Sequence, residues 1–146
     1  MTNTHPTAVE RTFNEITVGD TASSSHTITE NMVRSFVEIT NDKNPLHVDD
    51  LYASNTHHER RVVHGMLTAS FLSELIGMHL PGKFSLILSQ ATQFKKPVFI
   101  DDTILVAGTV TQKSEATHTV TLSITMLRDT EVVLNGTVVV LIEEGT

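Results

Sequence analysis

Hydrophobic residues in the second half of the chain alternate with polar ones, the pattern of a β-sheet that exposes one face to solvent. The clearest case is residues 119–126, in which threonine or serine occupies every other position. The pattern predicts strands over residues 85–99, 103–115, 117–127 and 131–144.

Short polar pairs mark turns in this region. Asp101-Asp102 and Arg128-Asp129 lie between predicted strands, where such residues favour turns. Asn135-Gly136 is typical of a hairpin turn, but the apolar runs on either side of it are too short for two strands. We therefore predict a glycine bulge within one long strand.

Apolar residues in the first half follow helical spacing instead. Thr29 is a good N-cap, and Glu30 in the first turn favours the helix dipole. They predict a short helix that ends near Asn41 and has an apolar face of Met32, Phe36, Val37 and Ile39. Upstream, the turn at residues 18–20 precedes a predicted strand.

The segment from Val62 to Leu80 is apolar on almost all sides, which predicts a helix buried on nearly every side. Pro81 and Gly82 end it. A buried helix followed by antiparallel strands indicates an α+β fold in which the sheet wraps the helix. The chain of 146 residues fits one domain, residues 13–146, after a patternless and flexible segment 1–12.

Composition narrows the function classes. The net charge of −7 argues against a nucleic-acid partner, because such binding draws on clustered lysine and arginine. The absence of cysteine excludes thiolate chemistry and cysteine-bound metals. We see no signal peptide and no apolar run long enough for a membrane span, and therefore expect a cytoplasmic protein without a membrane partner.

The candidate chemistry lies in the stretch NDKNPLHVDD, residues 41–50. Pro45 keeps Asn44 out of helical geometry, so we predict a fixed loop over 41–47 that carries Asp42 and His47. A carboxylate and an imidazole held together can share one water as acid and base. The alternative is ordinary turn chemistry, in which Asn and Asp bind their own backbone.

A second stretch, VVHGMLTAS, supplies the start of the buried helix. Gly65 leaves its N–H open to approach at the positive end of that helix, which suits an oxyanion. The alternatives are a satisfied histidine at 64, a glycine chosen for packing, and a small packing residue at Ser70. Together the two stretches contain what is needed to add water to a double bond conjugated with a carbonyl.

NDKNPLHVDD, RRVVHGMLTASFLSELIG and FKKPVFIDDTI together resemble the R-specific enoyl-CoA hydratases of the MaoC-like dehydratase family, over residues 13–142. The resemblance implies a hot-dog fold and reversible hydration of trans-2-enoyl-CoA to (R)-3-hydroxyacyl-CoA. It implies that Asp42 and His47 are the catalytic pair, that Asn44 shapes the loop, that Gly65 supplies an oxyanion N–H, and that Ser70 supports Asp42. It also implies a homodimer joined edge to edge, with acyl-CoA in a tunnel at the interface.

Two departures from the family pattern are Lys43 and His57-His58. Adjacent histidines point apart on a helix and no acidic or cysteine cluster accompanies them, so we expect no metal and no cofactor.

For the substrate we expect Asn44 and His64 at the reacting end and Lys95 and Lys96 at the CoA phosphates, with Arg60-Arg61 as the alternative phosphate site. The acyl chain would lie along Leu72, Leu75, Ile76, Leu80 and Phe84. The competing interpretation is that these apolar residues belong to the core and that the lysines are solvated.

Three other functions remain open. A 3-hydroxyacyl-[acyl-carrier-protein] dehydratase would use the same residues. A hot-dog thioesterase commonly has its carboxylate on the central helix, where Glu74 lies far from Gly65. A non-catalytic acyl-CoA-binding protein would lack the acid/base pair. The hydratase activity is compatible with β-oxidation, polyhydroxyalkanoate precursor supply and fatty-acid synthesis.

Overall fold

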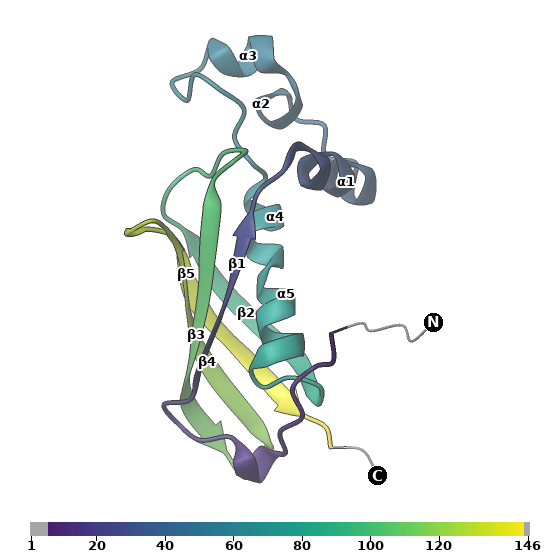
Figure 1. The fold of residues 1–146 in the computed structure, drawn as a ribbon, viewed down its shortest axis with the longest axis vertical. Coiled ribbons are helices and arrows are strands. Elements are labelled where there is room, and N and C mark those ends of the chain that lie inside the picture. Colours follow the sequence, from purple (N-terminus) through teal and green to yellow (C-terminus); the bar gives the residue numbers. More distant parts are fainter. Residues whose placement is uncertain (1–5, 145–146) are drawn as a thin grey trace.

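A five-stranded antiparallel sheet forms the body of the molecule, which we describe from a computed structural model over residues 6–144 (Figure 1). The order is β1-β3-β4-β5-β2. The strands are β1 (Thr21–Thr27), β2 (Ser85–Phe94), β3 (Thr103–Ser114), β4 (Thr119–Arg128) and β5 (Glu131–Ile142). The predicted α+β fold and the alternation in β4 are confirmed.

The central helix packs lengthwise on one face of this sheet and consists of α4 (Gly65–Ser70), α5 (Leu72–Glu74) and the π-helical turn η2 (Leu75–His79). Its inner side chains meet the inward positions of the strands in one hydrophobic core. Among them, Leu72, Leu75 and Ile76 are almost fully buried. Burial of such side chains is worth about 1.5–3 kcal/mol each, so this contact contributes strongly to stability.

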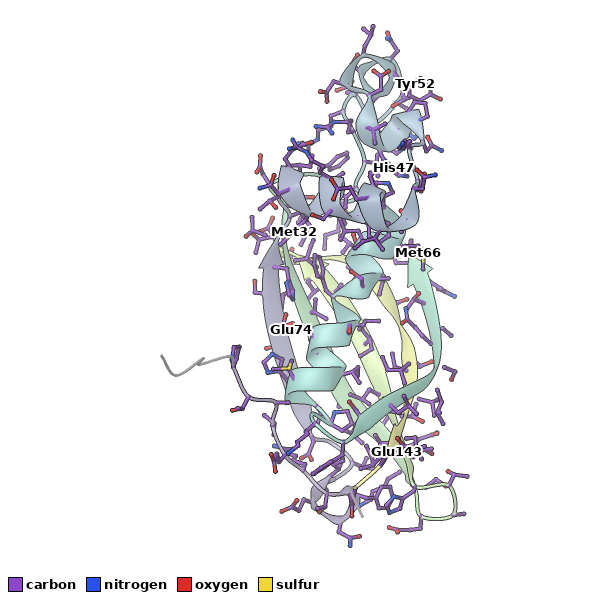
Figure 2. The ribbon with its side chains drawn as sticks, turned by 90° about the vertical axis from the view of Figure 1, so that its right-hand side faces the viewer. Met32, His47, Tyr52, Met66, Glu74 and Glu143 are labelled. Carbon is purple, nitrogen blue, oxygen red and sulfur yellow. The ribbon has the colours of Figure 1, made fainter. Side chains whose placement is uncertain are left out.

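Two predictions about the central helix need correction. It begins at Gly65 and not at Val62, because Val63 donates its N–H to the carbonyl of Val98 and belongs to an extended segment. It is also not buried on every side. Met66 is 66% exposed, and Ser70, Ser73 and Glu74 follow it on the same outward face. Figure 2 shows Met66 and Glu74 on the helix in front of the sheet.

Strand β2 ends at Phe94 and does not continue to residue 99. Lys95 and Lys96 both direct their N–H groups to the carbonyl of Val133, and Pro97 has no N–H to extend the ladder. β2 pairs only with β5, so its other edge is open.

Asn135-Gly136 lies inside the continuous strand β5, as predicted, but the bulge is elsewhere. The register passes Gly136 without a shift and slips instead at Val133. A Cβ at Gly136 would lie 2.1 Å from the carbonyl oxygen of Ala91. Glycine is therefore required by the close approach of β2, and not by a bulge.

Three short helices form an overhang beyond the end of the sheet (Figure 1). They are α1 (Glu30–Thr40), α2 (Pro45–Val48) and α3 (Asp50–Ser54). Thr29 caps α1 through the N–H of Met32 and the helix ends at Asn41, both as predicted, and Asn41 takes the left-handed conformation. Val33 is its buried residue, whereas Ile39, predicted on the apolar face, is exposed.

Residues 6–12 form no helix or strand and lead into the short helix η1 (Phe13–Glu15). Both backbone groups of Val9 are nevertheless hydrogen-bonded. Its N–H donates to the carbonyl of Met78, and its carbonyl accepts the N–H of Lys83. The part of the predicted flexible segment before residue 6 lies outside the described residues. No helix within residues 6–144 is long and apolar enough to cross a membrane.

Candidate active site

Asp42 lies on the loop that follows α1, and its own backbone contacts fix it there. Its N–H donates to the Thr40 hydroxyl at 3.2 Å, and its Oδ1 accepts the N–H of Asn44 at 3.1 Å. Asn44 in turn caps α2 by accepting the N–H of Leu46 at 3.0 Å. The side chain of Asp42 is 49% exposed, so its second oxygen remains available. Asn44 therefore shapes the loop, as expected.

We predicted that His47 lies on that loop, but it lies on helix α2. Pro45 takes the first helical position, where its missing N–H costs nothing, and so begins a helix directly after Asn44. Nδ1 of His47 lies 2.6 Å from the carbonyl oxygen of Val62. A carbonyl only accepts, so Nδ1 carries the proton and Nε2 keeps its lone pair.

His64 forms a cluster with Asp42 and His47. Its Nε2 lies 3.1 Å from the backbone oxygen of Asp42 and 3.8 Å from its Oδ2. Its ring stacks on that of His47 with centroids 4.0 Å apart. Asp42, His47 and His64 bring donor atoms within 4.8 Å of one another, and the loop, α2 and the start of α4 thus converge at one point.

This composition would also suit a small metal site. Nδ1 of His47 and Nε2 of His64, however, each contact a backbone carbonyl oxygen and so carry protons, which removes one nitrogen of each ring as a ligand. His57 and His58 lie in a turn and not on a helix, with ring centroids 3.8 Å apart, which corrects the reason that we gave for excluding them. The expectation of no metal stays a prediction.

Gly65 is the first residue of α4, where a backbone N–H has no partner in a preceding turn. A Cβ at this position would lie 3.0 Å from the ring of Phe94 on β2. Glycine thus allows the edge strand to approach the helix start closely. Ser70 behaves differently from the expectation, because its hydroxyl donates to Leu67 O at 2.6 Å and, among the described residues, not to Asp42.

Two hollows meet at this cluster. The larger, about 630 Å³, is the candidate catalytic pocket, and it is lined by Asp42, His47, His64, Gly65 and Ser70. Its remaining walls are Phe36, Thr40, Met66, Ala69, Gln90 and Phe94. The smaller, about 330 Å³, shares His47, Gly65 and Phe94 with it and is bordered by His58, Lys95 and Lys96. We call it the basic pocket.

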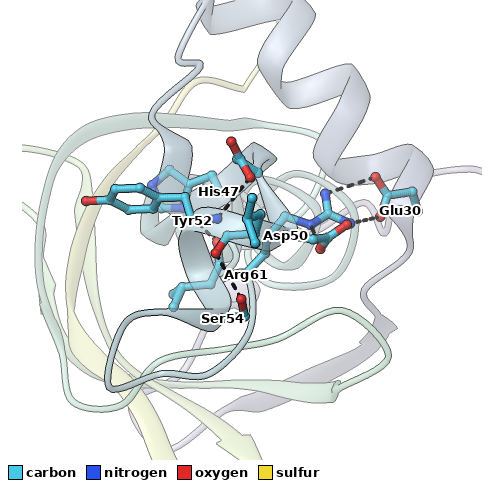
Figure 3. A network of polar contacts seen from close by, with 9 residues as sticks. Glu30, His47, Asp50, Tyr52, Ser54 and Arg61 are labelled. Atoms are coloured by element: carbon cyan, nitrogen blue, oxygen red, sulfur yellow. Dashed lines mark hydrogen bonds and ion pairs between the residues drawn. The ribbon is translucent and has the colours of Figure 1, made fainter.

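Arg61 joins helices α1 and α3 of the overhang by ion pairs (Figure 3). It binds both oxygens of Glu30 on α1, at 2.7 and 3.2 Å, and Asp50 on α3 at 2.7 Å. Hydrogen bonding to Glu30 is the main cause that raises the pKa of Arg61, and the same contact lowers the pKa of Glu30. The adjacent Val62 accepts from His47 and donates to Leu46. Arg61 therefore anchors the irregular segment, residues 61–64, that orients His47.

The sequence matches the MaoC-like domain over residues 14–132. The chain belongs to this family. It is 36% identical to the (R)-specific enoyl-CoA hydratase of Rhodospirillum rubrum over 130 residues, 89% of this chain and 90% of the relative. The solved structure of the (R)-hydratase from A. caviae involved in PHA biosynthesis matches with a TM-score of 0.84 at 37% identity, over 87% of this chain and 97% of the other.

A mitochondrial 3-hydroxyacyl-[acyl-carrier-protein] dehydratase of Arabidopsis thaliana is also similar, at 36% identity over 60% of this chain and 52% of the relative. The family has the hot-dog fold, and the sheet and central helix described above are that fold in this chain.

The residues that we expected to line an acyl-chain site in this MaoC-like chain do not line either hollow. Leu72, Leu75, Ile76 and Leu80 belong to the core, and neither they nor Phe84 line the two hollows. Their side chains face the sheet, whereas the catalytic pocket opens on the outward face of the helix. Met66, Ala69 and Phe36 are apolar residues that line this pocket instead, and hydrophobicity alone could not separate the two faces of the helix.

The two basic pairs, Lys95-Lys96 and Arg60-Arg61, have different surroundings. Lys95 and Lys96 border the basic pocket, as expected for a phosphate site. Arg61 is already paired with two carboxylates, and the Arg60 guanidinium stacks 3.9 Å from the centre of the Phe99 ring. Lys95 and Lys96 also have polar neighbours, Gln93 at 2.6 Å and Glu131 at 3.7 Å, so the choice of Lys95-Lys96 over Arg60-Arg61 as the phosphate site stays a prediction.

Proposed function

We propose that this MaoC-like protein catalyses the reversible hydration of trans-2-enoyl-CoA to (R)-3-hydroxyacyl-CoA. The observation that carries the proposal is the convergence of Asp42 and His47 on one pocket, with the lone pair of His47 Nε2 left free by the bond from Nδ1 to Val62. The similarity to named (R)-specific hydratases supports it.

The reaction follows from this geometry. His47 Nε2 takes a proton from a water that Asp42 orients by a second hydrogen bond. The water oxygen bonds to the β-carbon, and the π electrons move to the thioester oxygen, where the N–H of Gly65 stabilises the negative charge. The imidazolium then gives its proton to the α-carbon, which restores neutral His47 and completes the addition of water.

The substrate is placed by the two hollows. The acyl group lies in the catalytic pocket beside Met66 and Ala69, and the CoA phosphates lie toward Lys95 and Lys96 of the basic pocket. The catalytic pocket is bounded by edge strand β2 and the exposed face of α4, both of which lack a covering layer in one chain. A second copy of the chain completes the tunnel in a homodimer joined along β2.

The acyl-carrier-protein dehydratase is the second candidate, because the Arabidopsis relative bears that name. The thioesterase is disfavoured. Glu74, the acid on the central helix, pairs with His26 at 2.8 Å and His79 at 3.2 Å and does not line the catalytic pocket.

The proposal is tested by following the absorbance of the conjugated thioester when purified protein is mixed with trans-2-enoyl-CoA. We expect the absorbance to fall and chiral analysis to give the (R)-alcohol. An unchanged absorbance, or the (S)-alcohol, would contradict the proposal. Turnover of the same enoyl chain on CoA and on acyl-carrier protein decides between the two candidates, with a larger kcat/KM expected for CoA.

A further inference from the structure

His64 is almost completely enclosed, with 2% of its side chain exposed, yet it touches both members of the acid/base pair. Its Nε2 reaches the carbonyl oxygen of Asp42, so this nitrogen carries a proton. Its ring packs against that of His47 with centroids 4.0 Å apart and planes tilted by 31°, and Phe36 approaches it with centroids 5.0 Å apart. These contacts restrict the backbone of Asp42 and the ring of His47.

The other nitrogen of His64 identifies the tautomer. Nδ1 is buried and has no hydrogen-bond partner among the described residues. A protonated Nδ1 would be a buried donor without an acceptor, and the ring would then also carry a buried charge. The neutral Nε2–H form avoids both costs. His47 has its proton on Nδ1, so the two stacked rings carry opposite tautomers.

Thr68 is one helical turn from His64, and its Oγ1 is the other buried side-chain atom of the described residues that has no partner. Its N–H donates to the carbonyl of His64 at 3.2 Å, and His64 itself is the non-helical N-cap of α4. A hydroxyl both donates and accepts, so the tautomer is assigned from the burial of Nδ1 and not from Thr68.

We propose that His64 is a positioning residue: in the neutral Nε2–H form it holds the backbone of Asp42 and the ring of His47 in the geometry that the shared water requires. The catalytic part of this inference rests on the proposed hydration. His64 acts through its two neighbours, so its loss lowers kcat and leaves KM nearly unchanged.

Three variants separate the contributions. His64→Phe keeps a ring for stacking and removes the donor, and we expect kcat to fall about 10-fold or more with KM changed less than about 2-fold. His64→Gln places an amide N–H near the position of Nε2 and should restore most of the loss. His26→Phe is the matched control, because His26 stacks on Phe71 outside both hollows and should keep the wild-type kcat.

A double-variant cycle distinguishes positioning from general destabilisation. With Asp42→Asn in place, His64→Phe should cause little additional loss of kcat, because the group it positions is already inactive. Independent, multiplicative losses would overturn the proposal. So would equal losses in His64→Phe and His64→Gln, or an effect on KM alone.

The tautomer is measured without any activity, by ¹⁵N NMR of the histidine rings in the wild-type protein at neutral pH. We expect an unprotonated Nδ1 in His64 and a protonated Nδ1 in His47. The same tautomer in both rings, or an imidazolium at His64, would overturn the assignment even if the variants fold poorly. A protein with the expected tautomers and no hydration activity would instead contradict the proposed function.

Discussion

Asp42 and His47 are neighbours in sequence but are fixed in different ways. Asp42 depends on hydrogen bonds within its own loop, whereas His47 depends on Val62, a residue from a distant segment. Both side chains nevertheless border the same pocket. At the scale of single residues, the chemistry therefore requires one local contact and one long-range contact.

The first prediction concerns this pair. Asp42→Asn and His47→Asn should each lower turnover by about 10²-fold or more, the usual cost of losing an acid or base. Asn at 47 can still donate to Val62 but has no equivalent of Nε2. The double variant should be little worse than either single one, because both residues act on one water. Steady-state kinetics measures this, and Asp129→Asn, in the β4–β5 turn, serves as the control.

At the scale of elements, the Arg61 ion pairs hold two helices of the overhang to each other. Arg61 joins α1 to α3 and lies next to the acceptor of His47 (Figure 3). The side chain of Arg61 is largely buried, while Glu30 is 45% exposed, so solvent screens part of the attraction.

The second prediction follows from the lowered pKa of Glu30. A carboxylate with a lowered folded-state pKa stabilises the protein above its unfolded pKa of about 4.3, and this contribution is lost as the pH falls through the folded value. Glu30→Gln should therefore cost about 1 kcal/mol or less at pH 7 and nothing at strongly acidic pH. Thermal unfolding of both proteins across pH checks this. A difference that persists at acidic pH would contradict the ion-pair explanation.

At the scale of the whole molecule, one chain leaves an apolar edge uncovered. Leu86, Ile87, Leu88 and Phe94 on β2 are all exposed, and β2 has a partner on one side only. Exposed edges of this kind are usually paired or protected, and the catalytic pocket opens next to this one. The proposed dimer thus accounts for the edge and for the incomplete pocket together.

The third prediction tests this dimer. Leu88→Lys, at a position 54% exposed on the open edge, should shift the solution mass toward the monomer and lower activity. Leu105→Lys is the matched control, since Leu105 is 40% exposed on β3, which has strands on both sides. Sedimentation at micromolar concentration measures the mass. A fully active wild-type monomer would contradict the proposal.

The sequence by itself determined features that depend on local chemistry. Strand alternation, the Thr29 cap and the turns arise from interactions between residues a few positions apart, so pattern alone could predict them. The motif residues Asp42 and His47 were predicted from the chemistry of their side chains, and Gly65 from its place at the start of a helix.

Only the tertiary structure decided which face of each helix or strand packs in the core and which borders the pocket. Ile76 and Met66 are both apolar residues of one helix, yet one lies in the core and the other faces outward beside the pocket. Likewise, Gly136 is explained by the backbone of Ala91 on another strand, and the tautomer of His47 by Val62. These contacts join segments that are distant along the chain, and no local pattern encodes such distances.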